Sequence, residues 1–330
     1  MERQQHTTTY YNVYGLRLAV STHDPHIEAA FHARLKQWAV PSDSSPQLRF
    51  DFYCIDDIAQ SGLRSKDGRM RVVYEPRAGG EVLYDEEEDK LYIHWQEHIR
   101  LICSLTQGDV RVFYTPSASD NLWLLSHALF MLSLVELLKR RGHYSLHAAG
   151  LCINGNGLLL PGSSGSGKTT LAIALLRAGF GFLGDDTVFL TPEPEGLQVL
   201  AFPDEIDVTD NTIHLFPELH KFLQMPLVSG SPKRQVRAET VYEVNFVSAC
   251  RPAVLVFPRV ANVARSTLKP MGRDEAFLEL TPNILLTNPR ASQAHLDVLA
   301  ALVRQCDCYR LETGRDFDTL PDRLRELLGA

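Results

Sequence analysis

A glycine-rich segment between two apolar runs constrains the fold more than any other feature of the sequence. The run Leu158-Leu159-Leu160-Pro161 leads into Gly162-Ser163-Ser164-Gly165-Ser166-Gly167-Lys168-Thr169-Thr170, and a Leu- and Ala-rich stretch follows as far as Ala178. This segment satisfies G-x-x-x-x-G-K-[ST] with a strand pattern before it and a helix pattern after it. Glycines let the backbone coil so tightly that successive N–H groups face one anion, and the helix start adds its unpaired amides. The segment therefore predicts a phosphate-binding loop in an α/β fold.

The loop residues have distinct expected roles toward a nucleotide. The backbone and hydroxyl groups from Gly162 to Thr170 are expected to bind its phosphates. We expect Lys168 to reach the β- and γ-phosphates and the Thr169 hydroxyl to bind Mg²⁺. The chain contains no N-K-x-D sequence for guanine recognition and no L-S-G-G-Q signature of transporter ATPases. ATP with Mg²⁺ is therefore the expected cofactor.

A second feature is the acidic pair Asp185-Asp186, which stands between two apolar strand-like runs. Two adjacent carboxylates are costly to bury unless cations or hydrogen bonds match them. One can bind Mg²⁺ while the other accepts a proton from an attacking hydroxyl, as phosphoryl transfer requires. Asp185 is expected beside Thr169 as a metal ligand, and both aspartates are expected to be catalytic together with Lys168. The sequence leaves open which carboxylate acts as the base.

His147 precedes the phosphate-binding loop at the end of an expected neighbouring strand. An imidazole there is expected to hydrogen-bond an aspartate and adjust its basicity, and a structural histidine is the alternative. Further along, Glu205 or Asp207 is a candidate for another metal contact. A basic cluster is a candidate for phosphate or an acidic peptide, with a solvated loop as the alternative; it consists of Lys233, Arg234 and Arg237.

Length and charge suggest the organisation of the rest of the chain. A chain of 330 residues favours roughly two domains. We expect a smaller N-terminal α+β domain over 1–118, a connecting helix over 119–142 and the P-loop domain over 143–330. The first is expected to contain a strand over 10–18 and a small antiparallel sheet, and the last a strand over 240–247.

Charge and hydropathy exclude several partners. The net charge of −7 provides no global attraction for nucleic acid or anionic lipid. The apolar stretch 122–138 is shorter than a membrane span and includes polar residues, so we expect a buried helix and no membrane partner. The N-terminus shows no secretory pattern, so a cytoplasmic location is expected.

The order of motifs resembles a known family. His147, the Asn154-Gly155-Asn156-Gly157 hairpin, GSSGSGKTT, a short helix and Gly184-Asp185-Asp186 together resemble the catalytic domain of HPr kinase/phosphorylase, specifically over 144–190. The nearest likeness is to the related serine kinases found beside peptide-modification genes, some of which modify lasso-peptide precursors. The long glycine-rich signature that follows the aspartates in HPr kinase/phosphorylase proper, with its Glu and downstream Arg, is not evident here.

The resemblance implies a P-loop fold akin to that of phosphoenolpyruvate carboxykinase and an ATP- and Mg²⁺-dependent kinase. Its substrate would be a serine of a peptide or protein, and the family suggests a homo-oligomer. It also implies that Asp185 and Asp186 serve as metal ligand and base, with His147 supporting the base. A small-metabolite kinase and a non-catalytic, nucleotide-gated binding protein are the alternatives.

Overall fold

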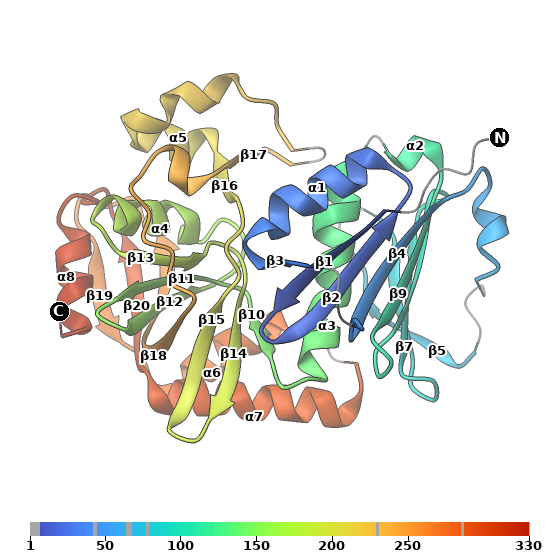
Figure 1. Cartoon of the computed structure of the whole chain (residues 1–330). Coiled ribbons are helices and arrows are strands. Elements are labelled where there is room, and N and C mark those ends of the chain that lie inside the picture. Colours follow the sequence, from blue (N-terminus) through green and yellow to red (C-terminus); the bar gives the residue numbers. More distant parts are fainter. Residues whose placement is uncertain are drawn as a thin grey trace. The chain divides into compact units, whose positions relative to one another are not determined.

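The computed structural model describes residues 7–41, 45–63, 68–76, 79–119, 121–228, 231–284 and 287–329. These form two compact units. Unit 1 comprises residues 7–141 and 287–292, and unit 2 comprises residues 142–284 and 293–329. The expected mixed α/β fold is confirmed, since both units combine helices with a large sheet (Figure 1).

Unit 1 is built around a nine-stranded sheet in the order β3-β1-β2-β4-β9-β8-β7-β6-β5. Its strands are β1 (Thr7–Val13), β2 (Leu16–Thr22), β3 (Ala39–Val40), β4 (Leu48–Cys54), β5 (Met70–Tyr74), β6 (Glu81–Asp85), β7 (Lys90–Trp95), β8 (Ile99–Ser104) and β9 (Asp109–Tyr114). Its helical segments are α1 (Pro25–Leu35), η1 (Lys36–Trp38), η2 (Ile58–Ser61), α2 (Pro116–Ser119), the π-helical η3 (Leu124–Leu129) and α3 (Phe130–Lys139).

One expectation for this unit was wrong. The single strand over 10–18 is a hairpin, because Tyr14 and Gly15 turn the chain with φ of 55° and 84°. The expected small antiparallel sheet is confirmed, since successive strands from β5 to β9 pair antiparallel. It is part of a larger mixed sheet, because β4 lies parallel to both β2 and β9. The apolar stretch 122–138 forms η3 and most of α3, whose buried residues include Leu134 and Leu137. Among the described residues, no helix combines the length and apolar character that a membrane crossing requires.

Unit 2 contains a second large sheet, in the order β10-β14-β15-β18-β12-β11-β13, with β20 beside β18 and β19 beside β20. Its strands are β10 (Tyr144–Leu146), β11 (Ala148–Ile153), β12 (Asn156–Pro161), β13 (Gly181–Gly184), β14 (Val188–Glu193), β15 (Gly196–Ala201), β16 (Ile206–Thr209), β17 (Lys233–Val236), β18 (Ala249–Val260), β19 (Thr267–Pro270) and β20 (Asp307–Thr313). Its helical segments are α4 (Lys168–Arg177), α5 (Asp210–Leu215), η4 (Pro217–Gln224), η5 (Ala238–Thr240), α6 (Arg273–Leu280), η6 (Thr281–Asn283), α7 (Pro289–Gln305), which begins in the unit 1 segment, and α8 (Leu320–Leu327). The strand expected over 240–247 was wrong, because this segment makes only the isolated bridge Phe182–Phe246.

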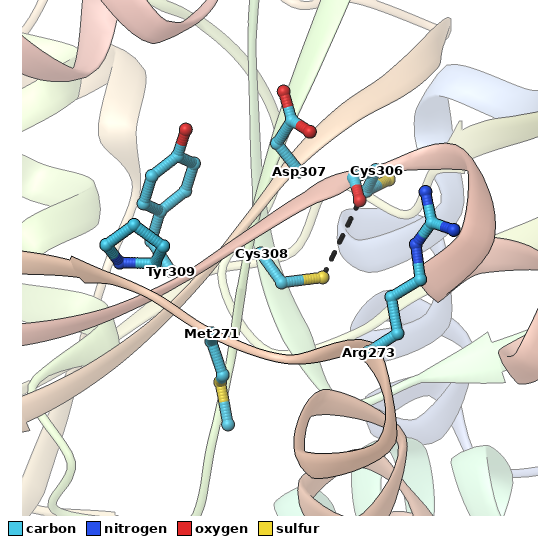
Figure 2. A pocket seen from close by; sticks show the side chains of 7 residues that line it. Met271, Arg273, Cys306, Asp307, Cys308 and Tyr309 are labelled. Carbon is cyan, nitrogen blue, oxygen red and sulfur yellow. Dashed lines mark hydrogen bonds between the residues drawn. The ribbon is translucent and has the colours of Figure 1, made fainter.

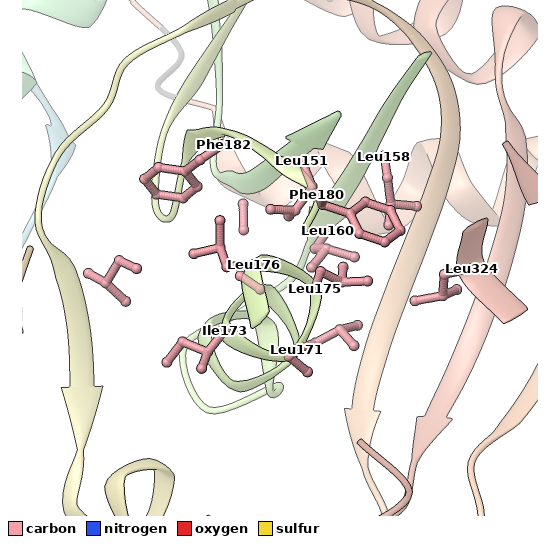
Figure 3. Close-up of a cluster of buried hydrophobic side chains, with 14 of the residues drawn as sticks. Leu151, Leu158, Leu160, Leu171, Ile173, Leu175, Leu176, Phe180, Phe182 and Leu324 are labelled. Carbon is pink, nitrogen blue, oxygen red and sulfur yellow. The ribbon is translucent and has the colours of Figure 1, made fainter. Parts of the chain in front are cut away.

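The continuous apolar run before the glycine loop is explained by burial on both faces of the sheet. Leu158 and Leu160 of β12 pack with α4 and α8 in one core cluster (Figure 3). Leu159 points to the other face and packs with α6 and α7. A strand covered on both faces reads as an unbroken apolar run rather than as an alternation. This double cover holds the strand that carries the loop.

Candidate functional site

Three strand ends place the predicted site residues at one edge of the unit 2 sheet. The loop begins where β12 ends, at Pro161. Its antiparallel neighbour β11 pairs Ala148 with Pro161, so His147 lies at the same edge. The next strand, β13, ends beside β11 at Gly184, and Asp185 and Asp186 follow it. The sheet topology thus brings together residues that are up to 39 positions apart in the sequence.

The loop between β12 and α4 has the backbone geometry that its glycines predict. Gly165 and Gly167 have φ of 84° and 101°, and Gly162 has φ of 153°. A Cβ on Gly162 would lie 2.8 Å from the Ser166 hydroxyl oxygen, so that position has no room for a side chain. Residues with a Cβ rarely adopt such φ values. The three glycines are therefore needed for this loop to close as it does.

Lys168 folds back over the loop. Its Nζ donates to the carbonyl oxygens of Gly162, at 2.5 Å, and Ser163, at 3.2 Å. It also lies 3.2 Å from His147 Nε2. The residue is only 7% exposed, and burial lowers its pKa, while the nearby charges of Asp186 and Asp185 oppose that shift. The ammonium is thus held against the backbone of the glycine loop.

His147 joins Lys168 to the acidic pair. Its Nδ1 lies 3.3 Å from Asp186 Oδ1. Because the Lys168 ammonium can only donate, His147 Nε2 accepts from it and Nδ1 carries the proton donated to Asp186. His147 contacts the acid as expected, and its supporting role in catalysis stays a prediction.

The two aspartates occupy opposite environments. Asp185 is 3% exposed, and its Oδ2 accepts from the Thr169 hydroxyl at 3.0 Å. Burial, and then the charge of Asp186, raise the pKa of Asp185 to about 7. The Asp186 side chain is 63% exposed. Desolvation opposes the ionisation of Asp186, but its hydrogen bond and electrostatic interaction with His147, and then the charge of Lys168, lower its pKa to about 2.

Two buried oxygen atoms of the site have no hydrogen-bond partner among the described residues, which fits a site for Mg²⁺ and phosphate. Asp185 Oδ1 is buried and has no hydrogen-bond partner among the described residues. The same holds for the Ser166 hydroxyl, which faces the inside of the loop near Gly162. Buried polar atoms normally have partners, and a carboxylate beside a threonine hydroxyl is an oxygen donor set that suits Mg²⁺. Thr170 differs, since its hydroxyl is 3.0 Å from that of Thr212 on α5.

The antiparallel strands β16 and β17, which α5 and η4 separate in the chain, add charged residues to this site. Asp207 lies 3.4 Å from Lys233, and its charge contributes to the raised pKa of Asp185. The expected basic cluster is paired with acids, since Arg237 lies 3.3 Å from Glu205 and Arg234 contacts Asp210. The sequence indicated Asp207 only as one of two candidates. The contact between Asp207 and Lys233 depends on the pairing of β16 with β17. No local sequence motif indicates that pairing.

A small cavity, separate from the candidate site, lies beside the first residues of β20. It has a volume of 170 Å³, and its lining includes Met271, Arg273, Cys306 and Cys308 (Figure 2). Burial raises the pKa of the Cys308 thiol to about 11, so this thiol is uncharged at neutral pH. No residue predicted for the phosphate site lines this cavity.

Comparisons with known proteins leave the family open. No family model matches the chain, and no curated protein matches it. Among solved structures, the chain is similar to the Hpr(Ser) kinase/phosphatase from Coxiella burnetii, with 13% identity and a TM-score of 0.29. That match covers 56% of this chain and 93% of the other.

Proposed function

We propose that this protein is an ATP- and Mg²⁺-dependent kinase that phosphorylates a serine hydroxyl of a peptide or protein, with unit 2 as an HPr-kinase-like P-loop domain. One observation carries the proposal. A glycine loop of phosphate-binding geometry shares one sheet edge with two adjacent carboxylates, one buried and one exposed. This is the combination that phosphoryl transfer requires.

The different environments of the aspartates support a division of roles. Asp185 and Thr169 would hold Mg²⁺, because Asp185 is buried, contacts the Thr169 hydroxyl and has an unpaired oxygen. Asp207 is a further candidate ligand at this site. Bound Mg²⁺–ATP would supply the phosphoryl group and neutralise charge on its oxygens.

Asp186 is suited to orient the acceptor hydroxyl and to take its proton. It is exposed and stays ionised at neutral pH because its pKa is about 2. His147 Nδ1 lies 3.3 Å from Oδ1, and the Thr187 hydroxyl donates to Oδ2 at 3.5 Å. A base of low pKa suits a loose transition state, in which the proton leaves late.

Lys168 is expected to change partners when nucleotide binds. Its present acceptors are two loop carbonyls and His147, all neutral. Phosphate oxygens would be stronger acceptors because they carry charge.

We propose that unit 1 contributes to recognition of the acceptor peptide or protein.

The test is a phosphotransfer assay. The protein is incubated with Mg²⁺, ATP and serine-containing peptides, including those encoded beside its gene, and a gain of one phosphate is scored by mass spectrometry. Each acceptor is paired with its Ser→Ala version. Asp186→Asn should lower kcat by roughly 100-fold or more, the scale of losing a general base. Lys168→Ala should abolish transfer with the fold intact; retained activity in both variants contradicts the proposed site.

A further inference from the structure

An exposed valine lies against the phosphate-binding loop. Val260 ends β18 and is 70% exposed, although its side chain is entirely apolar. A Cβ on Gly167 would lie 3.2 Å from Val260 Cγ2, so this side chain contacts the loop where α4 begins. Val263, in the segment that follows, is 45% exposed. Two exposed apolar residues thus lie at the end of β18 and in the segment that follows it.

The strand order places Val260 on the side of the loop opposite the acidic pair. In the order β13-β11-β12-β18, the loop follows the third strand. Asp186 and His147 lie at the β13 and β11 ends, and Val260 lies at the β18 end, because β18 runs parallel to β12. A linear triphosphate whose terminal phosphoryl lies near His147 and Asp186 therefore has its other end directed toward β18.

The segment after Val260 is held in place by hydrogen bonds. The Ala261 N–H donates to Thr313 O at 3.0 Å, and the Arg315 N–H donates to Ala264 O at 3.3 Å. At its end, the Ser266 hydroxyl donates to Asp316 Oδ1 at 2.5 Å and accepts from the Gly314 N–H at 2.9 Å. A protein segment that is already ordered before binding loses little conformational entropy when a ligand packs against it.

We propose that Val260 is the contact surface for the nucleoside of the bound nucleotide. This inference rests on the proposed function and assigns its base-side subsite. The flat apolar face of a base, or the ribose beside it, would cover the exposed methyl groups of Val260. The phosphates would be held by the loop alone, so the two parts of the ligand have separable binding residues.

The test compares ATP with inorganic tripolyphosphate, which has the phosphates and no nucleoside. Dissociation constants of both ligands, with Mg²⁺, are measured by titration calorimetry for the wild type, Val260→Ala and Val260→Ile. Leu278→Ala serves as the control, because Leu278 is an apolar side chain of similar exposure, 67%, on α6. Circular dichroism checks the fold of each variant.

Val260→Ala should weaken ATP binding about tenfold, the scale of losing the burial of two methyl groups, and leave tripolyphosphate binding unchanged. Val260→Ile should retain ATP affinity, and Leu278→Ala should alter neither ligand. Unchanged ATP affinity in Val260→Ala, or equal weakening of both ligands, overturns this inference while the phosphate site stands. A wild type that binds neither ligand overturns the proposed function and this inference together.

Discussion

At the scale of single residues, the site depends on two neighbouring aspartates with opposite pKa shifts. Burial is the largest cause of the raised pKa of Asp185. The hydrogen bond with His147 is the largest of the effects that lower the pKa of Asp186. A group held in an unfavourable environment lowers the stability of the fold, and such groups concentrate at functional sites. The cost of keeping Asp185 ionised should therefore be measurable.

Asp185→Asn should stabilise the Mg²⁺-free protein at pH 8. Because the folded pKa of about 7 exceeds the ordinary value, the folded state binds more protons than the unfolded state between roughly pH 4 and pH 7. The free energy of unfolding of the wild type should thus fall across that window. The variant should lack this fall and be more stable at pH 8 by on the order of 4 kcal/mol. Asparagine can still accept the Thr169 hydrogen bond.

Urea denaturation at pH 4.5 and pH 8 measures this difference. The two proteins should converge at the lower pH. Equal stability of wild type and variant at pH 8 would show that Asp185 does not bear this cost, and would remove the argument for it as the buried metal ligand.

At the scale of elements, two glycines with similar left-handed conformations flank helix α4, one at each end. Gly167 caps its N-terminus with φ of 101°, and Gly179 follows its C-terminus with φ of 84°. A left-handed conformation is unfavourable for alanine at either end by about 1 kcal/mol. Only Gly167 belongs to the phosphate-binding loop.

Gly167→Ala and Gly179→Ala should therefore lower stability similarly, by about 1 kcal/mol each. Gly167→Ala should also weaken ATP binding at least tenfold, because the new Cβ would be 3.2 Å from Val260 Cγ2 and shifts the loop. A Cβ at Gly179 meets nothing within 4 Å, so its ATP affinity should be unchanged. Calorimetric titration distinguishes the two, and equal ATP affinities would contradict the loop geometry.

At the scale of the whole molecule, unit 1 is completed by a segment from late in the sequence. Thr287 is 1% exposed; its hydroxyl donates to Glu136 Oε2 at 2.6 Å and accepts from Arg140 at 3.1 Å. Glu136 is fully buried and also contacts Lys139 and Arg140. Arg140 continues the network to Asp89 at 2.8 Å. Buried charges of this kind need every partner.

Thr287→Val should lower the stability of unit 1 by about 1–3 kcal/mol, because Glu136 loses a hydrogen bond where water cannot replace it. The three tryptophans, Trp38, Trp95 and Trp123, all lie in unit 1, so tryptophan fluorescence during denaturation reports on that unit. Thr281→Val, in unit 2, is the control and should leave this signal unchanged. An unshifted fluorescence transition in Thr287→Val would contradict the role of the returning segment.

Local patterns were enough to predict much of unit 2. The glycine loop, α4 and the buried strand β12 follow from residues that are neighbours in the chain, because backbone conformation and face-by-face burial are local properties. The hairpin β1–β2 was missed, since Tyr14-Gly15 is a weak turn signal inside a continuous strand-like run. The strand over 240–247 was wrongly expected because a β-favouring composition does not provide a pairing partner.

Residues that are neighbours in the chain were enough to predict a glycine-rich loop between a strand and a helix. The folded chain was needed to show that Asp185 is buried beside Thr169 while Asp186 is exposed beside His147. The same holds for Thr287, which completes unit 1. The reason is physical: burial and hydrogen-bond partners come from segments distant in the sequence, brought together by strand pairing that no local pattern encodes.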